Sequence, residues 1–131
     1  LTYWQDGEYL PDNLAAIDHL MRDHRSGKTT EMDRNLLDML YALQQRVGME
    51  SGEFEIISAY RSPATNEMLR GKSSGVAKGS LHMQGKAIDI RLCDCNLKTL
   101  RDNALALKAG GVGYYPKSGF IHVDTGRVRF W

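Results

Sequence analysis

The sequence has few of the features that stabilise a protein without a hydrophobic core. It contains two cysteines and three prolines in 131 residues, which excludes a disulfide scaffold and a proline-rich fibrous chain. Seventeen basic and sixteen acidic side chains leave a formal net charge of +1, so there is no overall attraction to nucleic acid or to anionic membranes. No apolar run approaches the ~20 residues of a membrane span. With 42% hydrophobic residues, residues 1–131 are expected to form one globular domain.

The two cysteines and the first residue say little about the compartment in which the chain resides. Cys93 and Cys95 are separated by one residue and are predicted to be free thiols in or near a loop. The chain begins at Leu1 and shows no signal-peptide pattern. We therefore expect that a leader was removed or that the chain was trimmed.

Helical periodicity dominates the first half of the chain. Pro11-Asp12-Asn13 is a start signal for a helix that is predicted to stop at Ser26-Gly27. Thr30 is predicted to cap a second helix, which ends at Gly48. The apolar residues at helical spacing are assigned to the core: Leu14, Ile17, Leu20, Met21, Met32, Leu36, Leu37, Leu40, Leu43 and Val47.

Short strands and turns dominate the second half. Ser62 is predicted to cap a helix that ends at Leu69, and Asn96 one that is closed by Gly110-Gly111. A loop rich in Gly, Ser and Lys is expected over 71–80. Strands are predicted over 54–60, 86–92, 112–115, 120–125 and 128–131. This order predicts an α+β domain with a mainly antiparallel sheet and N-terminal helices packed on one face.

Common motifs of hydrolases and nucleotide-binding proteins are missing from the sequence. It has no His-Glu-x-x-His segment and no Gly-x-Ser-x-Gly nucleophile elbow. Segments near Gly71 and Gly85 approach a phosphate-binding loop but lack its glycine or its spacing. A nucleotide site is therefore not expected.

Two of the four histidines lie in segments dense in small and polar residues. His82 precedes Asp89 by seven residues, and Gly85 between them allows a sharp turn that would bring both side chains to one point. His122 lies on a predicted strand whose alternation places it on the same face as Asp124. Two imidazoles and one carboxylate form a zinc ligand set that leaves a fourth position for water, as in catalytic sites.

A structural role is the alternative for each of these residues. Either histidine, taken alone, is also explained as a hydrogen-bonded residue, and Asp89 as the partner of Arg61 or Arg91. His19 and His24 lie five residues apart, not on one helical face, and are predicted to be solvated. Spacing alone supports the metal site and the structural interpretation equally.

Several motifs together resemble those of the M15-type zinc peptidases, which have the Hedgehog/DD-peptidase fold. The general match is Ser-x-His-x-x-Gly-x-Ala-x-Asp at 80–89, with His122 late in the chain. The closer match is to the YcbK-like murein endopeptidase branch. Four segments between 54 and 131 carry that closer match: Ser58–Pro63, Lys78–His82, Gly110–Pro116 and Phe120–Gly126.

The resemblance also implies roles for individual residues. Arg61, after the first strand, is expected to contact the substrate or to stabilise a developing oxyanion, the alternative being a surface salt bridge. Ser80 and Gln84 are further candidates for substrate binding, and Ser80 also for supporting a ligand. The implied Zn²⁺ ligands are His82, Asp89 and His122.

One position departs from the family pattern. Many M15 peptidases have a glutamate general base three residues before the last histidine ligand, where this sequence has Gly119. Asp124, two residues after His122, is a candidate for that catalytic role. It is equally a candidate for a group that orients the imidazole.

The resemblance implies a zinc-dependent peptidase that hydrolyses peptide bonds in peptidoglycan stem peptides or cross-links, a murein endopeptidase. The alternatives are a D,D- or L,D-carboxypeptidase, a zinc-containing peptidoglycan-binding domain without turnover, and an interaction domain without metal. The expected partner is the peptidoglycan peptide, with no nucleic acid and no membrane span, and the chain is expected to be a monomer. Because peptidoglycan lies outside the cytoplasmic membrane, we expect a periplasmic or cell-surface location.

Overall fold

Helices precede most of the strands in the described part of the chain. The computed structural model describes residues 4–5, 8–48, 52–72, 76–77 and 79–131. The first elements are β1 (Trp4–Gln5), β2 (Glu8–Tyr9), α1 (Pro11–Leu20), α2 (Arg34–Val47), β3 (Phe54–Ser58) and α3 (Pro63–Arg70). They are followed by the 3₁₀ turn η2 (Leu81–Gln84), β4 (Ala87–Leu92), α4 (Leu97–Leu107), β5 (Gly111–Tyr115), β6 (Phe120–Asp124) and β7 (Arg129–Phe130).

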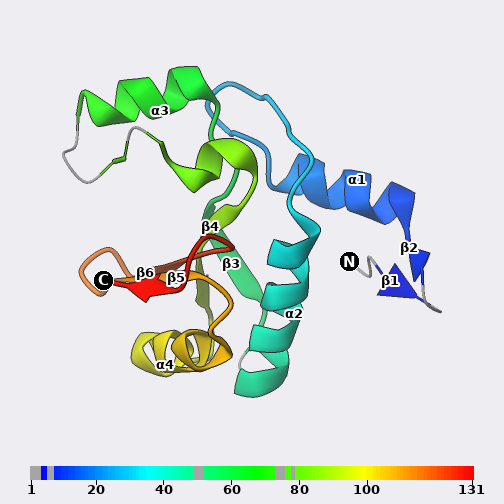
Figure 1. The fold of residues 1–131 in the computed structure, drawn as a ribbon, viewed down its shortest axis with the longest axis vertical. Coiled ribbons are helices and arrows are strands. Elements are labelled where there is room, and N and C mark those ends of the chain that lie inside the picture. The colour runs from blue at the N-terminus through cyan, green and yellow to red at the C-terminus, as the bar shows by residue number, and fades with distance from the viewer. Residues whose placement is uncertain (1–3, 6–7, 49–51, 73–75, 78) are drawn as a thin grey trace.

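A five-stranded sheet with the order β3-β4-β6-β5-β7 forms the centre of the fold. Its pairs are antiparallel except β5 with β7, which is parallel. α4 packs against β4, β5 and β6, and α2 packs against α4 (Figure 1). The predicted α+β class with a mainly antiparallel sheet is confirmed. None of the described helices is long and apolar enough to cross a bilayer.

The alternation of β4 and β6 gives the sheet two chemically different faces. Ile88 and Ile90 of β4 and Ile121 of β6 are almost fully buried in the core shared with the helices. Asp89 lies between the two isoleucines of β4 and His122 directly follows Ile121, so both side chains point to the opposite face. Burial of the apolar face thus determines which polar side chains line the other face.

Several predicted element ends are confirmed and others are wrong. Asp33, not Thr30, caps α2: its carboxylate accepts hydrogen bonds from the Asn35 backbone N–H at 3.0 Å and from the Thr125 hydroxyl at 2.7 Å. The side chain at this cap therefore also ties the start of α2 to the end of β6. α4 ends at Leu107 and is capped by Lys108, which adopts the left-handed conformation, before the predicted Gly110-Gly111 stop. The caps predicted for α3 and α4 are confirmed: Ser62 and Asn96.

Three further predictions concern the loop over 71–80, the two cysteines and the end of α1. The loop predicted over 71–80 includes residues 73–75 and 78, which lie outside the described part of the chain. Cys93 and Cys95 are free, as predicted. α1 ends at Leu20, before the predicted stop at Ser26-Gly27, because the residues after it fold around a buried carboxylate.

Asp23 is that carboxylate, and it is 3% exposed. It accepts hydrogen bonds from the backbone N–H of Arg25 at 2.9 Å, of Ser26 at 3.3 Å and of Ser62 at 2.9 Å. Burial alone would raise the pKa of Asp23, but these hydrogen bonds and one from Thr65 lower it well below its usual range. The ionised side chain therefore holds the loop after α1 against the start of α3.

We predict that Asp23→Asn destabilises the fold in a pH-dependent way. The folded pKa lies below the unfolded value of about 3.9, so the ionised carboxylate stabilises the fold above that pH and loses its contribution as the pH falls. Urea unfolding should show a loss of about 2 kcal/mol near pH 7 and a smaller loss near pH 3. The exposed Glu53→Gln is the matched control. Equal losses at both pH values would contradict this prediction.

Candidate metal centre

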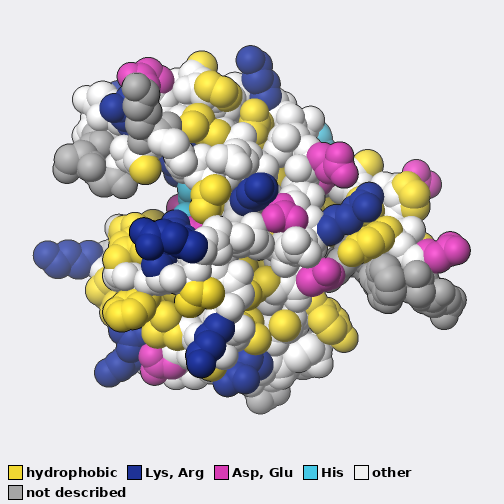
Figure 2. Space-filling view, in the orientation of Figure 1, with side chains coloured by type: hydrophobic (Ala, Val, Ile, Leu, Met, Phe, Trp, Pro, Cys, Tyr) yellow, Lys and Arg dark blue, Asp and Glu magenta, His cyan; other side chains and the backbone are white. Residues whose placement is uncertain are grey.

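A cleft of about 340 Å³ lies on the polar face of the sheet. Residues 76–77 and 79–81 line one of its sides, and the β5–β6 hairpin and the end of the chain line the other. Figure 2 shows histidine and acidic side chains at the bottom of an indentation at the left of the molecule, with hydrophobic side chains along its lower edge. His82, Asp89 and His122 all line this cleft.

The local sequence places His82 at the bottom of the cleft. The Ser80 hydroxyl accepts a hydrogen bond from the His82 backbone N–H at 3.2 Å and caps η2, and Gly85 ends η2 in the left-handed conformation (φ 68°). A Cβ at Gly85 would lie 2.9 Å from a Thr30 methyl group, so both conformation and space favour glycine. The turn predicted at Gly85 is confirmed.

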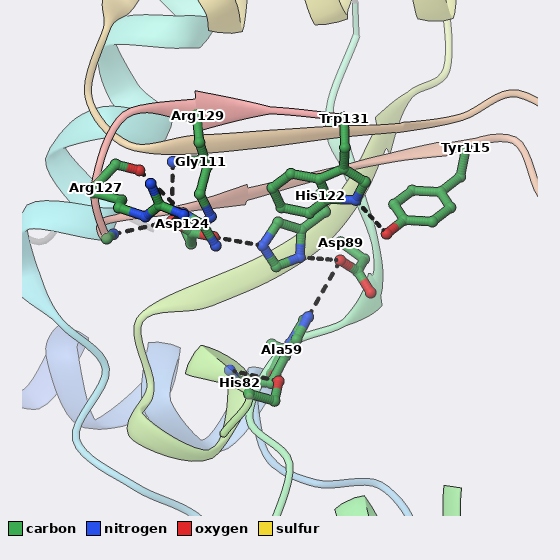
Figure 3. Close-up of polar contacts among 12 residues, drawn as sticks. Ala59, His82, Asp89, Gly111, Tyr115, His122, Asp124, Arg127, Arg129 and Trp131 are labelled. Atoms are coloured by element: carbon green, nitrogen blue, oxygen red, sulfur yellow. Dashed lines mark hydrogen bonds and ion pairs between the residues drawn. The ribbon is translucent and has the colours of Figure 1, made fainter. Parts of the chain in front are cut away.

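A backbone carbonyl determines the tautomer of His82. Its Nδ1 lies 2.7 Å from the carbonyl oxygen of Ala59, directly after β3. Because a carbonyl only accepts, Nδ1 carries a proton and donates it to Ala59, which leaves Nε2 as the nitrogen directed to the cleft. Nε2 faces Asp89 Oδ1 at 3.3 Å (Figure 3).

Strand register brings Asp89 and His122 together. The two residues are direct partners in the antiparallel β4–β6 pair, and His122 Nδ1 lies 3.0 Å from Asp89 Oδ1. Burial alone would raise the pKa of Asp89, but hydrogen bonds from His122 and His82 lower it to about 2. Asp89 is therefore ionised at neutral pH and negatively charged toward both rings.

Asp124 holds the other nitrogen of His122. Its Oδ2 lies 2.7 Å from His122 Nε2, and Asp124 is completely buried. Burial lowers the pKa of His122, but the hydrogen bonds with Asp124 and Asp89 outweigh it, so the pKa is raised overall. With Nε2 donating to Asp124, Nδ1 is the nitrogen that faces Asp89 and the cleft.

Asp124 is itself fixed by a set of donors. Burial alone would raise its pKa, but the hydrogen bonds hold it well below its usual range. Arg129 Nη1 and Nη2 bind both carboxylate oxygens, at 3.0 and 2.9 Å, and the backbone N–H groups of Gly111 and Gly126 each donate at 2.9 Å. Asp124 is thus an ionised, buried group with five hydrogen bonds, counting that from His122.

The three donors at the bottom of the cleft fit a zinc ion. One ligand atom each from His82, Asp89 and His122 lie within 4.8 Å of one another. The tetrahedral zinc geometry with bonds of about 2.0–2.1 Å separates ligand atoms by roughly 3.3 Å, close to the 3.0 and 3.3 Å found here. An ionised carboxylate and two imidazoles held in place by hydrogen bonds form a donor set that suits zinc.

Arg61 lines the same cleft beside these donors. Its backbone N–H donates to the carbonyl of His82 at 3.1 Å, and its Nη1 donates to Asn66 Oδ1 at 3.1 Å. Burial lowers the pKa of Arg61 and the nearby Asp89 carboxylate opposes that shift, yet a guanidinium remains charged. Its Nε is buried and has no partner among the described residues. In place of a surface salt bridge, the structure therefore shows a half-buried cation that lines the cleft.

Of the other residues named from the sequence, some line the cleft and others lie outside it. Ser80 lines the cleft, whereas Gln84 is exposed at the end of η2 and is not part of the cleft lining. Arg91 pairs with Glu55 at 2.7 Å on the exposed side, not with Asp89. His19 and His24 are exposed, as predicted.

Gly119 adopts a φ of 79° in the turn between β5 and β6. Side chains disfavour that conformation. A glutamate in this conformation would be strained, which agrees with the departure from the pattern of many M15 peptidases.

Sequence reasoning did not identify three residues that complete the site. Asn66 is buried and orients Arg61. Arg129 binds Asp124, and Trp131 packs beside His122 with ring centroids 5.2 Å apart. For the last two, the sequence predicted a strand over 128–131 but did not reveal its partner.

Comparisons with known proteins agree with this arrangement. A protein-family model described as Peptidoglycan L,D-endopeptidase MepK, of the Peptidase M15_2 type, matches residues 1–131. The chain is 48% identical over 123 residues to the "Probable peptidoglycan L,D-endopeptidase MepK" of Haemophilus influenzae, and 45% identical over 123 residues to the Escherichia coli K12 protein named Peptidoglycan L,D-endopeptidase MepK.

The alignments cover 94% of this chain, and 66% and 67% of the two relatives, so the chain spans about two thirds of their length. No solved structure matches the chain significantly. The family resemblance carried by the sequence motifs is confirmed. The chain belongs to the M15-type peptidase family of the peptidoglycan L,D-endopeptidase MepK.

Proposed function

We propose that the chain is a zinc-dependent endopeptidase that cleaves L,D-peptide bonds in peptidoglycan cross-links or stem peptides. The observation that carries this proposal is the buried cluster of His82, Asp89 and His122 at the bottom of an open cleft. The names of the two relatives supply the substrate class. Such a substrate implies a periplasmic or cell-surface location.

In this proposal the three donors hold the metal and the surrounding groups keep them in place. When bound, zinc supplies a Lewis acid that polarises a peptide carbonyl and lowers the pKa of a bound water toward ~7. The Ala59 carbonyl and the Asp124 carboxylate orient the two imidazoles. The Arg61 guanidinium binds the peptide and stabilises negative charge on its carbonyl oxygen as that charge develops.

We assign Asp124 to orienting His122 and not to proton transfer. A general base needs a free lone pair within about 3 Å of the proton that it removes. Asp124 is completely buried, and donors from His122, Arg129 and the backbone occupy its oxygens. Its depressed pKa suits a permanent anion that stabilises an imidazole donor.

A zinc-containing peptidoglycan-binding domain without turnover is the second candidate. Its support is the absence, among the described residues that line the cleft, of any carboxylate besides Asp89 and Asp124. Both are already engaged by the imidazoles. The two candidates share the metal and the substrate and differ only in product formation.

Zinc loading and muropeptide digestion test the proposal together. We expect about one zinc per chain by elemental analysis, and new stem-peptide ends by mass spectrometry when the loaded protein is incubated with cross-linked muropeptides. A chelator should abolish the cleavage, and added zinc should restore it, because the metal provides the Lewis acid.

The matched variants are His122→Ala and His24→Ala. His122→Ala removes a proposed ligand and should lose both zinc and cleavage, whereas His24 is exposed and its variant should keep both. Less than half an equivalent of zinc in the wild type after reconstitution would contradict the metal site. Full zinc content without new peptide ends would favour the binding domain.

Asp124→Asn separates the two roles of that carboxylate. If it orients His122, the apparent zinc affinity measured against a chromophoric chelator should fall by about 10- to 100-fold. Cleavage should then recover at saturating zinc. Unchanged zinc affinity with cleavage lost at every zinc concentration would instead indicate a general base. A thermal melt of the variant reports whether the fold persists.

A further inference from the structure

Trp131 packs beside β5 and lines the cleft. The Trp131 backbone N–H donates to Val112 O at 3.1 Å, and its carbonyl accepts from the Tyr114 N–H at 3.0 Å, which continues the parallel β5–β7 pairing. Its indole lies over Gly113, where a Cβ would come within 2.6 Å of Cε2. Gly113 is the direct partner of His122 in the β5–β6 pair. The indole therefore packs on the sheet face that carries the metal donors.

The indole also makes a hydrogen bond that fixes a neighbouring hydroxyl. Trp131 Nε1–H donates to Tyr115 Oη at 2.6 Å (Figure 3). Tyr115 lies two residues after Gly113, so its side chain is on the same face as His122, and it lines the cleft. Phe120, its partner across the strands, stacks on its ring with centroids 4.9 Å apart. Ring stacking and the indole together define where the hydroxyl lies.

The direction of this hydrogen bond leaves the hydroxyl proton available. An indole nitrogen only donates, so Tyr115 Oη is the acceptor in this pair and its own O–H must find another acceptor. Among the described residues, none takes that proton in a hydrogen bond. The Tyr115 hydroxyl is therefore free to donate a hydrogen bond into the cleft. The expected occupant of the cleft is a peptide, which has many carbonyl oxygens.

We propose that Tyr115 donates a hydrogen bond to a carbonyl or carboxylate oxygen of the bound peptide, and that Trp131 is the residue that positions it. This inference rests on the proposed function for the identity of the occupant. This inference also explains the segment from Gly113 to Tyr115. Gly113 leaves room for the indole, and the indole holds the Tyr115 hydroxyl in place. Tyr114, in contrast, points to the other face, under Arg101 of α4 with the guanidinium 4.5 Å from the ring centroid.

A double-mutant cycle tests the pair in the zinc-loaded chain. Tyr115→Phe removes only the hydroxyl, and Trp131→Phe keeps an aromatic ring but removes the N–H donor. Each should lower kcat/KM for a cross-linked muropeptide dimer by about fivefold, the effect of one neutral hydrogen bond. Zinc content and melting temperature should stay unchanged in Tyr115→Phe. Tyr114→Phe, the neighbouring tyrosine on the opposite face, should match the wild type.

The coupling distinguishes positioning from packing. If Trp131 acts through the hydroxyl, Trp131→Phe should cost nothing more in the Tyr115→Phe background. An equal loss in both backgrounds would overturn the positioning role, since a purely structural cover over His122 would be needed in either. Unchanged kcat/KM in Tyr115→Phe would overturn the donor role.

Failure of the proposed function would have a different signature. If the zinc-loaded wild type leaves the dimer intact, the endopeptidase proposal fails, and the same dimer then serves as titrant in calorimetry. Tyr115→Phe must still weaken its dissociation constant about fivefold. An unchanged constant, or no binding of the dimer to the wild type, would overturn the inference about Tyr115.

Discussion

The site depends on one imidazole held between two carboxylates. His122 faces Asp89 through Nδ1 at 3.0 Å and Asp124 through Nε2 at 2.7 Å, so the rotation of the ring is fixed. The contact with Asp89 follows from the register of β4 against β6. A slip by one residue would turn Asp89 toward the core and bring Ile88 or Ile90 to the cleft. Burial of those isoleucines therefore protects the geometry of the donors.

The two carboxylates differ because their surroundings differ. Asp89 has imidazoles as its hydrogen-bonding partners and opens onto the cleft. Asp124 has a guanidinium and two glycine N–H groups behind it. The glycines are required because a side chain at Gly111 would collide with Arg129 and with Asp124 itself. One face of the sheet thus carries an aspartate that binds the cation in the proposed function and another that orients an imidazole.

The sequence predicted interactions between residues close in the chain better than interactions between residues far apart. Helix caps such as Ser62 and Asn96 depend on neighbours two or three residues away and were predicted correctly. Asp33 was missed although it is also a local cap, because Thr30 offers the same signal and only the contact with Thr125, far along the chain, favours Asp33. The candidate donors His82, Asp89 and His122 were named from a motif and a family resemblance. Nothing in the sequence indicated that they would meet through strand register.

Arg129 and Trp131 were beyond prediction for the same reason. A strand at the end of the chain was expected, but its parallel pairing with β5 places these side chains beside Asp124 and His122. Short strands carry too little pattern to specify their partner. The glycines of β5 were the available clue, since repeated glycines in a strand mark close approach by another group. Here that group is the indole over Gly113.

The turn at Gly119 has a consequence for the chemistry of the cleft. Its left-handed conformation disfavours the glutamate that other M15 peptidases have there, and Asp124 is too enclosed to replace it. Apart from the two imidazoles and the two aspartates, the polar side chains among the described residues that line the cleft are Arg61, Ser80, Tyr115, Arg129 and Trp131, and none of them is a carboxylate. If the proposed function holds, catalysis in this chain relies on stabilising negative charge on the peptide more than on removing a proton with a protein carboxylate. That difference follows from a single backbone conformation in the β5–β6 turn.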